Sequence, residues 1–114
     1  MRDPRERLRD ILEAIEKIER HAQKGRRAFE EGELLQVWFV RHLQVLGESA
    51  RALPRDVRDL APSVPWSKIL GMRNILVHDY FDVDTKVVWD VVERDLPELK
   101  PEIAELLRKL ESRR

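Results

Sequence analysis

The chain has 114 residues, and we expect one domain spanning residues 1–114. Lysine and arginine number 22 and the acidic residues also number 22, so the formal net charge is +0. This balance excludes a strongly basic nucleic-acid platform and a polybasic membrane binder, but it leaves room for a local basic patch. The absence of cysteine excludes disulfides and thiolate metal sites. The apolar runs are too short to span a bilayer and the N-terminus has no apolar leader, so we expect a cytosolic protein with no membrane partner.

The first helix is predicted to begin at Asp3 and Pro4, because aspartate can cap a helix and proline suits its first position. Apolar residues then recur at steps of three and four from Leu8 to Ile18, which places them on one side of an α-helix. Gly25 is predicted to end this helix. The polar stretch 26–32 is predicted to be a connection, with room for a helical turn of its own.

The second helix is predicted from about residue 33 into the region 50–53, ending before Pro54. It is apolar on several sides, which is typical of a central helix or of one that also contributes to a subunit interface. Gly47 in its interior costs roughly 1 kcal/mol relative to alanine. We therefore expect another backbone to pack closely at Gly47. His42 lies among apolar residues and is predicted to be a buried or interface histidine.

Prolines in the stretch 54–65 predict a connection, and a third helix is predicted from Pro65 to about His78. The valine-rich stretch 86–93 lacks the strict alternation of a strand, so we predict a fourth helix there. Pro97 is expected to interrupt it before a last helical segment. The predicted fold is an all-α, up-down bundle of four to five helices.

The most informative stretch is 71–80, in which an arginine, an asparagine, a histidine and a tyrosine lie among apolar residues. Arg73 and His78 are five residues apart and lie about 140° apart on an ideal helix, so they do not share a side. Asn74 and His78 are four apart and face each other. Tyr80 returns to within about 20° of Arg73 if the helix continues. We expect the helix end to bend this group together, and a second copy across a dimer axis to complete the cleft.

These side chains are sufficient for cleaving RNA, which supplies its own nucleophile, the 2′-hydroxyl. An arginine can bind phosphate oxygens and stabilise their charge, while a histidine can exchange a proton near neutral pH. No metal spacing is recognisable in the sequence, and we predict neither a metal nor another cofactor. Glu48 could pair with Arg73 and orient it, or form a surface ion pair. By spacing alone, an arginine and a histidine five residues apart on a charged helix usually have no catalytic role.

A family resemblance separates these interpretations. Arg73, four residues, His78, any residue and Tyr80 match the motif of the HEPN superfamily. More narrowly, the chain resembles HepT-like toxins over roughly residues 7–110. The similar segments are residues 9–15, 46–50, 65–74, 80–84, 88–92 and 95–99.

The resemblance implies a HEPN-like helical homodimer that acts as a metal-independent endoribonuclease toxin of a type VII toxin–antitoxin system. It implies that Arg73 and His78 form the catalytic pair, with Asn74 in support. It also implies an antitoxin partner, a minimal nucleotidyltransferase (MntA-like), which adds AMP from ATP to Tyr80. An added AMP would block RNA sterically and compete for Arg73.

Two alternatives remain at this stage. In one, a non-catalytic helical dimer binds a nucleotide, or serves a nucleotidyltransferase partner as its substrate or scaffold. In the other, a helical dimer has an unrelated role, and Tyr80 is an aromatic residue packed at a helix end.

Overall fold

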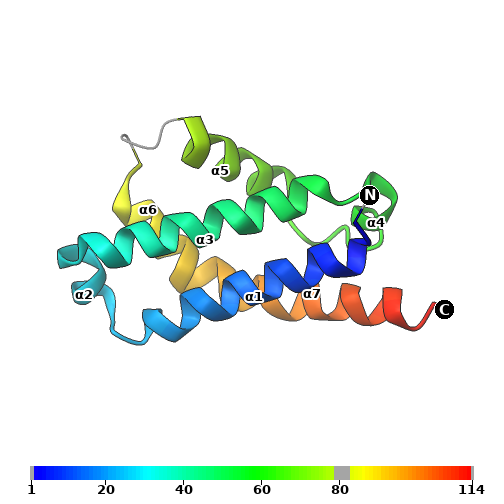
Figure 1. Cartoon of the computed structure of the whole chain (residues 1–114), viewed down its shortest axis with the longest axis horizontal. Coiled ribbons are helices and arrows are strands. Elements are labelled where there is room, and N and C mark those ends of the chain that lie inside the picture. The colour runs from blue at the N-terminus through cyan, green and yellow to red at the C-terminus, as the bar shows by residue number, and fades with distance from the viewer. Residues whose placement is uncertain (1, 79–82, 114) are drawn as a thin grey trace.

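The computed structural model describes residues 2–78 and 83–113, and these residues form a helical bundle 47 × 28 × 23 Å in extent. The longer helices are α1 (Pro4–Ala22), α3 (Glu33–Ala52), α5 (Trp66–His78) and α7 (Leu96–Glu111). The shorter segments are α2 (Arg26–Glu31), α4 (Arg55–Arg58), α6 (Thr85–Asp90) and the π-helical η2 (Val91–Asp95). In Figure 1, α3 runs along the middle of the bundle, with α5 on one side and α1 and α7 on the other. The all-α prediction is confirmed.

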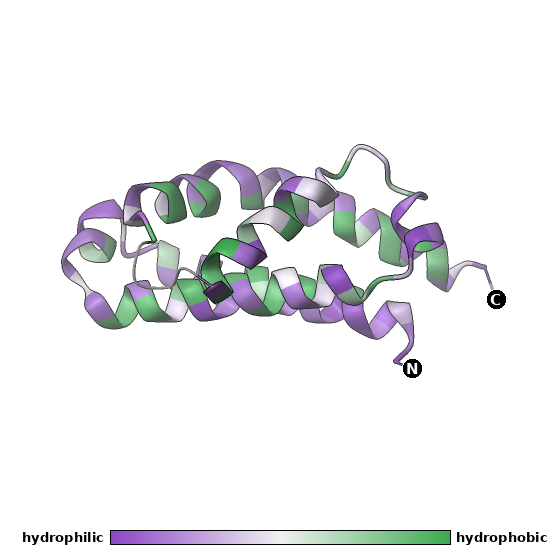
Figure 2. Cartoon of the chain, turned by 90° about the horizontal axis from the view of Figure 1, so that it is seen from above, coloured by the Kyte–Doolittle hydropathy of each residue, from purple (hydrophilic) through white to green (hydrophobic). Residues whose placement is uncertain are grey.

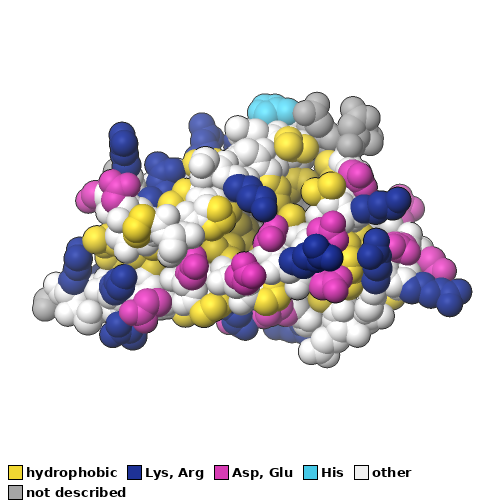
Figure 3. Space-filling model, turned by 180° about the vertical axis from the view of Figure 1, so that it is seen from behind, with side chains coloured by type: hydrophobic (Ala, Val, Ile, Leu, Met, Phe, Trp, Pro, Cys, Tyr) yellow, Lys and Arg dark blue, Asp and Glu magenta, His cyan; other side chains and the backbone are white. Residues whose placement is uncertain are grey.

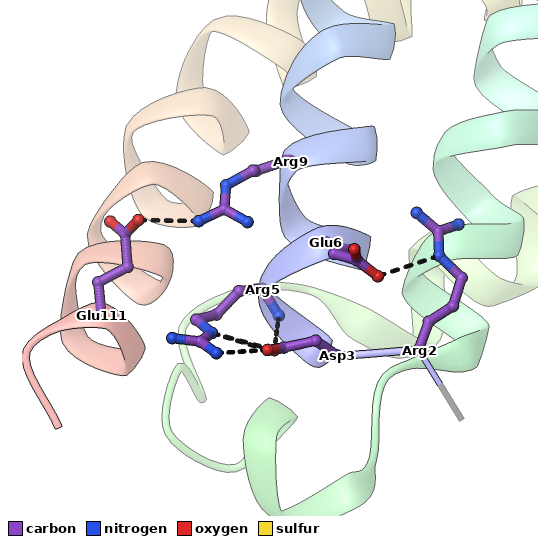
Figure 4. A network of polar contacts seen from close by, with 6 residues as sticks. All are labelled: Arg2, Asp3, Arg5, Glu6, Arg9 and Glu111. Carbon is purple, nitrogen blue, oxygen red and sulfur yellow. Dashed lines mark hydrogen bonds and ion pairs between the residues drawn. The ribbon is translucent and has the colours of Figure 1, made fainter. Parts of the chain in front are cut away.

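Helix α1 begins as its sequence predicts. The side chain of Asp3 accepts a hydrogen bond from the backbone N–H of Arg5, at 2.9 Å, and Pro4 occupies the first position. The Arg5 guanidinium also donates to the same carboxylate, and these hydrogen bonds lower the pKa of Asp3 to about 2. Figure 4 shows this cap beside the Arg9–Glu111 ion pair, which ties α1 to the end of α7. The two chain ends therefore meet at one end of the bundle.

The core lies between α1, α3 and the continuous segment from α6 to α7. Its fully buried side chains include Phe29, Phe39, Leu8, Ile11, Ile15, Ile18, Leu43, Leu46, Leu96, Ile103 and Leu106. Figure 2 shows hydrophobic positions recurring along the helices between hydrophilic ones, as expected for amphipathic helices. The stretch 26–32, predicted as a connection, forms the six-residue helix α2, because Phe29 enters the core and stacks on Phe39 with ring centroids 5.2 Å apart.

Pro97 does not interrupt the last helical region, so that prediction is wrong. Helix α6, η2 and α7 follow one another without a break. The N–H of Leu96 donates a hydrogen bond to the carbonyl of Val91, five residues earlier. This π-helical turn is wider than an α-helical one, and it shifts the helical register immediately before the proline. Pro97 follows this turn as one of the first two residues of α7, and the wider turn accommodates a residue that cannot donate a backbone hydrogen bond.

His42 lies in a small aromatic cluster between α1 and α3. Its ring packs edge-on against Trp38 at a centroid distance of 4.3 Å, and the ring of His21 contacts the same indole at 5.2 Å. Burial lowers the pKa of His42, and the positive charges of Lys17 and Arg41 lower it further. Its Nε2 atom is buried without a hydrogen-bond partner among the described residues. The prediction of a buried histidine is confirmed in part, because His42 is half-buried.

Over residues 2–78 and 83–113, no helix combines the length and the apolar character needed to cross a bilayer.

Candidate functional site

Arg73 lies where α5 crosses α3, and its side chain is only 13% exposed. The two helices run antiparallel at the crossing, because Gly47 of α3 meets Arg73 while Gln44, one turn earlier, meets Leu76. A Cβ atom placed on Gly47 would lie 2.5 Å from the Cβ and 2.8 Å from the Cγ of Arg73. The close approach predicted at Gly47 is therefore confirmed, and it fixes the stem of the arginine against α3.

The next residue of α3, Glu48, holds the head of the same arginine. The Nε atom of Arg73 donates to Oε1 of Glu48 at 2.7 Å, and Nη2 forms an ion pair with the same oxygen. Glu48 was expected either to pair with Arg73 or to form a surface ion pair, and in the structure it pairs with Arg73. Glu48 itself is 49% exposed, so this ion pair lies at the edge of the crossing and in contact with solvent.

Asn74 supports the arginine from its own helix. Its side-chain carbonyl accepts a hydrogen bond from Nη1 of Arg73 at 2.9 Å. We expected Asn74 to face His78, four residues later. In the structure its oxygen is turned toward the guanidinium instead, so Asn74 and Glu48 hold Arg73 from two sides.

His78 is the last residue of α5 and is exposed. The helix stays regular through His78, so the expected bend that would bring it to Arg73 does not occur before that residue. Ideal helix geometry separates the Cα atoms of residues five apart by about 9 Å. Within one chain, therefore, α5 carries both groups but does not bring them together.

Tyr80, the predicted modification site, lies outside the described residues, as does Asp79. A residue two positions beyond His78 along the chain can be at most about 7 Å away, Cα to Cα.

Gln44 also belongs to this site, although no sequence motif predicts it. Gln44 donates a hydrogen bond from Nε2 to the backbone carbonyl of Leu76, at 2.9 Å. This carbonyl belongs to the last turn of α5, where helical carbonyls lack partners within the helix. Gln44 and Glu48 are four residues apart and lie on the same side of α3, a spacing that could have indicated a shared partner helix.

The site thus combines a half-buried, pre-oriented cation with an exposed imidazole on one helix. Such a cation can bind a phosphate oxygen, and such an imidazole can exchange a proton with solvent or a bound ligand. Within residues 2–78 and 83–113, no group of three or more histidine, aspartate or glutamate side chains is placed to hold a metal ion.

The fold and the site define a class: an all-α protein whose α5 helix carries an arginine, an amide and a terminal histidine. The sequence comparison makes the class specific, since the profile of the family described as Ribonuclease HepT-like matches residues 11–106. The chain belongs to this ribonuclease family, and both the predicted resemblance and the enzyme class are confirmed.

Relatives of nearly the same length are similar along almost the whole chain. "Putative RNase TTE0752" of Caldanaerobacter subterraneus subsp. tengcongensis is 36% identical over 110 residues, which cover 96% of this chain and 98% of the relative. "Probable ribonuclease HepT" of Thermococcus cleftensis is 38% identical over 108 residues, covering 92% of this chain and 96% of the relative.

A third relative is longer. "Gamma-glutamylcyclotransferase and putative RNase MJ0434" of Methanocaldococcus jannaschii is 36% identical over 105 residues, and the match covers 91% of this chain but 47% of that protein. No solved structure gives a significant match.

Proposed function

We propose that this chain is the toxin of a toxin–antitoxin pair and cleaves RNA endonucleolytically without a metal ion. The observation that carries the proposal is the arrangement of Arg73 in a chain of the HepT-like ribonuclease family. Its guanidinium is held by Glu48 and Asn74 on the helix that ends in His78. A cation fixed before the substrate arrives stabilises developing charge without the cost of reorienting during the reaction.

The proposed reaction uses the 2′-hydroxyl of the RNA as the nucleophile. Its oxygen attacks the adjacent phosphorus while the bond from phosphorus to the 5′-oxygen of the next nucleotide breaks. Arg73 stabilises the negative charge on the non-bridging oxygens, and His78 takes or gives the proton. The products are a 2′,3′-cyclic phosphate, which hydrolysis converts to a 3′-phosphate, and a 5′-hydroxyl.

We propose that the working site is formed by two copies of the chain. On an ideal helix the Cα atoms of Arg73 and His78 are about 9 Å apart and lie about 140° around the axis from each other, so a second copy can supply a further arginine and histidine to the same cleft. A groove of about 770 Å³ between α5 and the segment α6–η2–α7 provides an apolar face beside the site. Ile75 and Val87 line this groove and are 55% and 56% exposed. Figure 3 shows hydrophobic side chains gathered across the middle of the rear face, bordered by charged ones.

The third part of the proposal concerns control. A nucleotidyltransferase antitoxin adds AMP to Tyr80: the phenolic oxygen attacks the α-phosphorus of ATP, and pyrophosphate leaves. Tyr80 is within about 7 Å of His78 by chain length alone. The added phosphate therefore carries negative charge to the end of α5 and competes with RNA for the arginine.

The test is cleavage of RNA by the purified protein in EDTA, followed by analysis of the RNA ends. Arg73→Ala and His78→Ala should each abolish cleavage, whereas Glu16→Ala, which removes an exposed carboxylate on α1, should not. Intact-mass spectrometry after incubation with the antitoxin and ATP should show added AMP in the wild type but not in Tyr80→Phe. Modification without cleavage by the unmodified protein would favour the non-catalytic dimer instead.

The dimer is tested separately by analytical ultracentrifugation. Ile75→Glu should shift the protein to monomer, because a charge in the groove cannot be buried against a second copy. Leu34→Glu is the matched control, since Leu34 is 87% exposed on α3 and does not line the groove. A dimer that persists in Ile75→Glu would show that the interface lies elsewhere.

A further inference from the structure

The guanidinium of Arg73 is only partly available to a substrate. Arginine has five N–H donors, which form one fork at the side, from Nε and Nη2, and another at the end, from Nη1 and Nη2. A single oxygen of Glu48 receives both the Nε and the Nη2 donors, so it occupies the side fork. Asn74 accepts one hydrogen bond from Nη1. Among residues 2–78 and 83–113 these are its partners, which leaves one N–H on each of Nη1 and Nη2 for a phosphate.

We propose that Glu48 is the positioning residue for Arg73, and that it presents the end of the guanidinium to the scissile phosphate of RNA. This inference rests on the proposed ribonuclease function, and it adds a role for α3 that the motif on α5 does not contain. Glu48 acts through Arg73 and does not itself touch the substrate.

The packing explains why the position of the head depends on Glu48. Gly47 lets the Cβ and Cγ of Arg73 lie against α3, so the stem has little room to move. Beyond Cγ the side chain has further rotatable bonds, and without a partner the guanidinium could adopt more than one rotamer. The two contacts to one carboxylate oxygen hold the guanidinium in a single orientation, with the fork from Nε and Nη2 directed at Glu48.

A competing role for Glu48 makes the opposite prediction. If the carboxylate merely neutralised Arg73, phosphate would have to displace it, and loss of the charge would raise affinity for RNA. Positioning depends on the acceptor oxygen rather than on the charge. Glutamine keeps that oxygen and removes the charge, so Glu48→Gln separates the two roles.

The experiment compares wild type, Glu48→Gln, Glu48→Ala and the control Glu16→Ala by RNA cleavage in EDTA, with urea unfolding of each. Glu48→Ala should lower kcat by on the order of 10- to 100-fold, because a reacting group displaced by about 1 Å loses roughly that much. Glu48→Gln should stay within about tenfold of the wild type, since a neutral acceptor retains a weaker hydrogen bond. The unfolding midpoints of the two Glu48 variants should be alike, so that stability does not account for the difference.

A second measurement does not depend on activity. In NMR spectra, the Nε–H resonance of Arg73 can be assigned by its absence in Arg73→Lys. This resonance should be sharp, and its hydrogen should exchange slowly with solvent, in the wild type and in Glu48→Gln. In Glu48→Ala the hydrogen should exchange rapidly. Failure of the wild type to cleave RNA would defeat the proposed function, while the resonance would still decide the positioning role. Equal cleavage in Glu48→Ala and wild type, tighter RNA binding in Glu48→Ala, or an unprotected Arg73 Nε–H in the wild type would each overturn the inference.

Discussion

Replacing Gly47 with alanine tests how closely α3 and α5 must approach for the site to form. The added methyl group would lie 2.5 Å from the Cβ of Arg73, 2.8 Å from its Cγ and 3.4 Å from its Cα. These contacts involve the start of the side chain and the backbone, so a rotamer change cannot relieve them. Helix α5 has to retreat by about 0.9 Å before the shortest of these contacts reaches 3.4 Å, where ordinary van der Waals contact begins.

The expected change in stability is a difference of two effects. Alanine in a helix interior is favoured over glycine by about 1 kcal/mol. Overpacking a tight contact costs about 1–3 kcal/mol. We therefore expect Gly47→Ala to lower the free energy of unfolding by up to about 2 kcal/mol. The retreat of α5 also carries Arg73 away from Glu48, and a displacement near 1 Å should lower RNA cleavage by on the order of 100-fold.

Urea unfolding followed by circular dichroism measures the first effect, and cleavage in EDTA measures the second. Gly71→Ala is the matched control, because Gly71 is also helical and a Cβ there meets nothing within 4 Å. That variant should gain up to about 1 kcal/mol from helix propensity. If Gly47→Ala is as stable as Gly71→Ala and cleaves RNA like the wild type, the tight crossing does not control the site.

Further predictions concern the contacts of three other residues. Gln44→Ala should lower the free energy of unfolding by about 1 kcal/mol, because the carbonyl of Leu76 loses its hydrogen bond; urea unfolding checks this, and an unchanged midpoint would contradict it. His42→Phe should raise stability by roughly 1 kcal/mol, because the unpaired Nε2 is removed while the contact with Trp38 is kept. Since the pKa of folded His42 is lowered, the wild type should also lose stability as the pH falls below about 6.5, and His42→Phe should lose less. The pKa of Asp3 is lowered to about 2, so its ionised form stabilises the fold above the ordinary value of 3.8, and this contribution disappears as the pH falls toward 2. The difference in Tm between wild type and Asp3→Asn should shrink over that interval, and a constant difference would show that the charge on Asp3 does not matter.

The sequence predicts local features of this fold well because their causes are local. Asp3 and Pro4 start α1, and the spacing of apolar residues places the longer helices. Gly47 shows that one long-range feature is also predictable, since a glycine that weakens a helix usually has a packing reason. Pro97 shows the limit of such rules. Its effect depends on whether the preceding turn is α-helical or π-helical, and the residues of η2 carry no recognisable signal of that choice.

The candidate site was predictable as a set of residues but not as an arrangement. The motif identifies Arg73, Asn74 and His78, yet Glu48, the carboxylate that pairs with Arg73, lies on a different helix 25 residues earlier in the sequence. Which carboxylate of α3 meets the arginine depends on the register of the antiparallel crossing. That register is fixed jointly by Gly47 and Gln44, and the contact of Gln44 with a backbone carbonyl leaves no trace in the sequence of α5.

The arrangement of α5 also constrains how the reaction can be assembled. Arg73 is held on the side of the helix that faces α3, while His78 lies about 140° around the helix, with its Cα atom roughly 9 Å from that of Arg73. A 2′-hydroxyl and the phosphorus it attacks are separated by less than about 3.5 Å at reaction. We propose that a second copy of α5 supplies the imidazole that serves the phosphate bound by Arg73. The proposed dimer and the proposed role of Glu48 are therefore linked, because Glu48 fixes the arginine that the second copy has to meet.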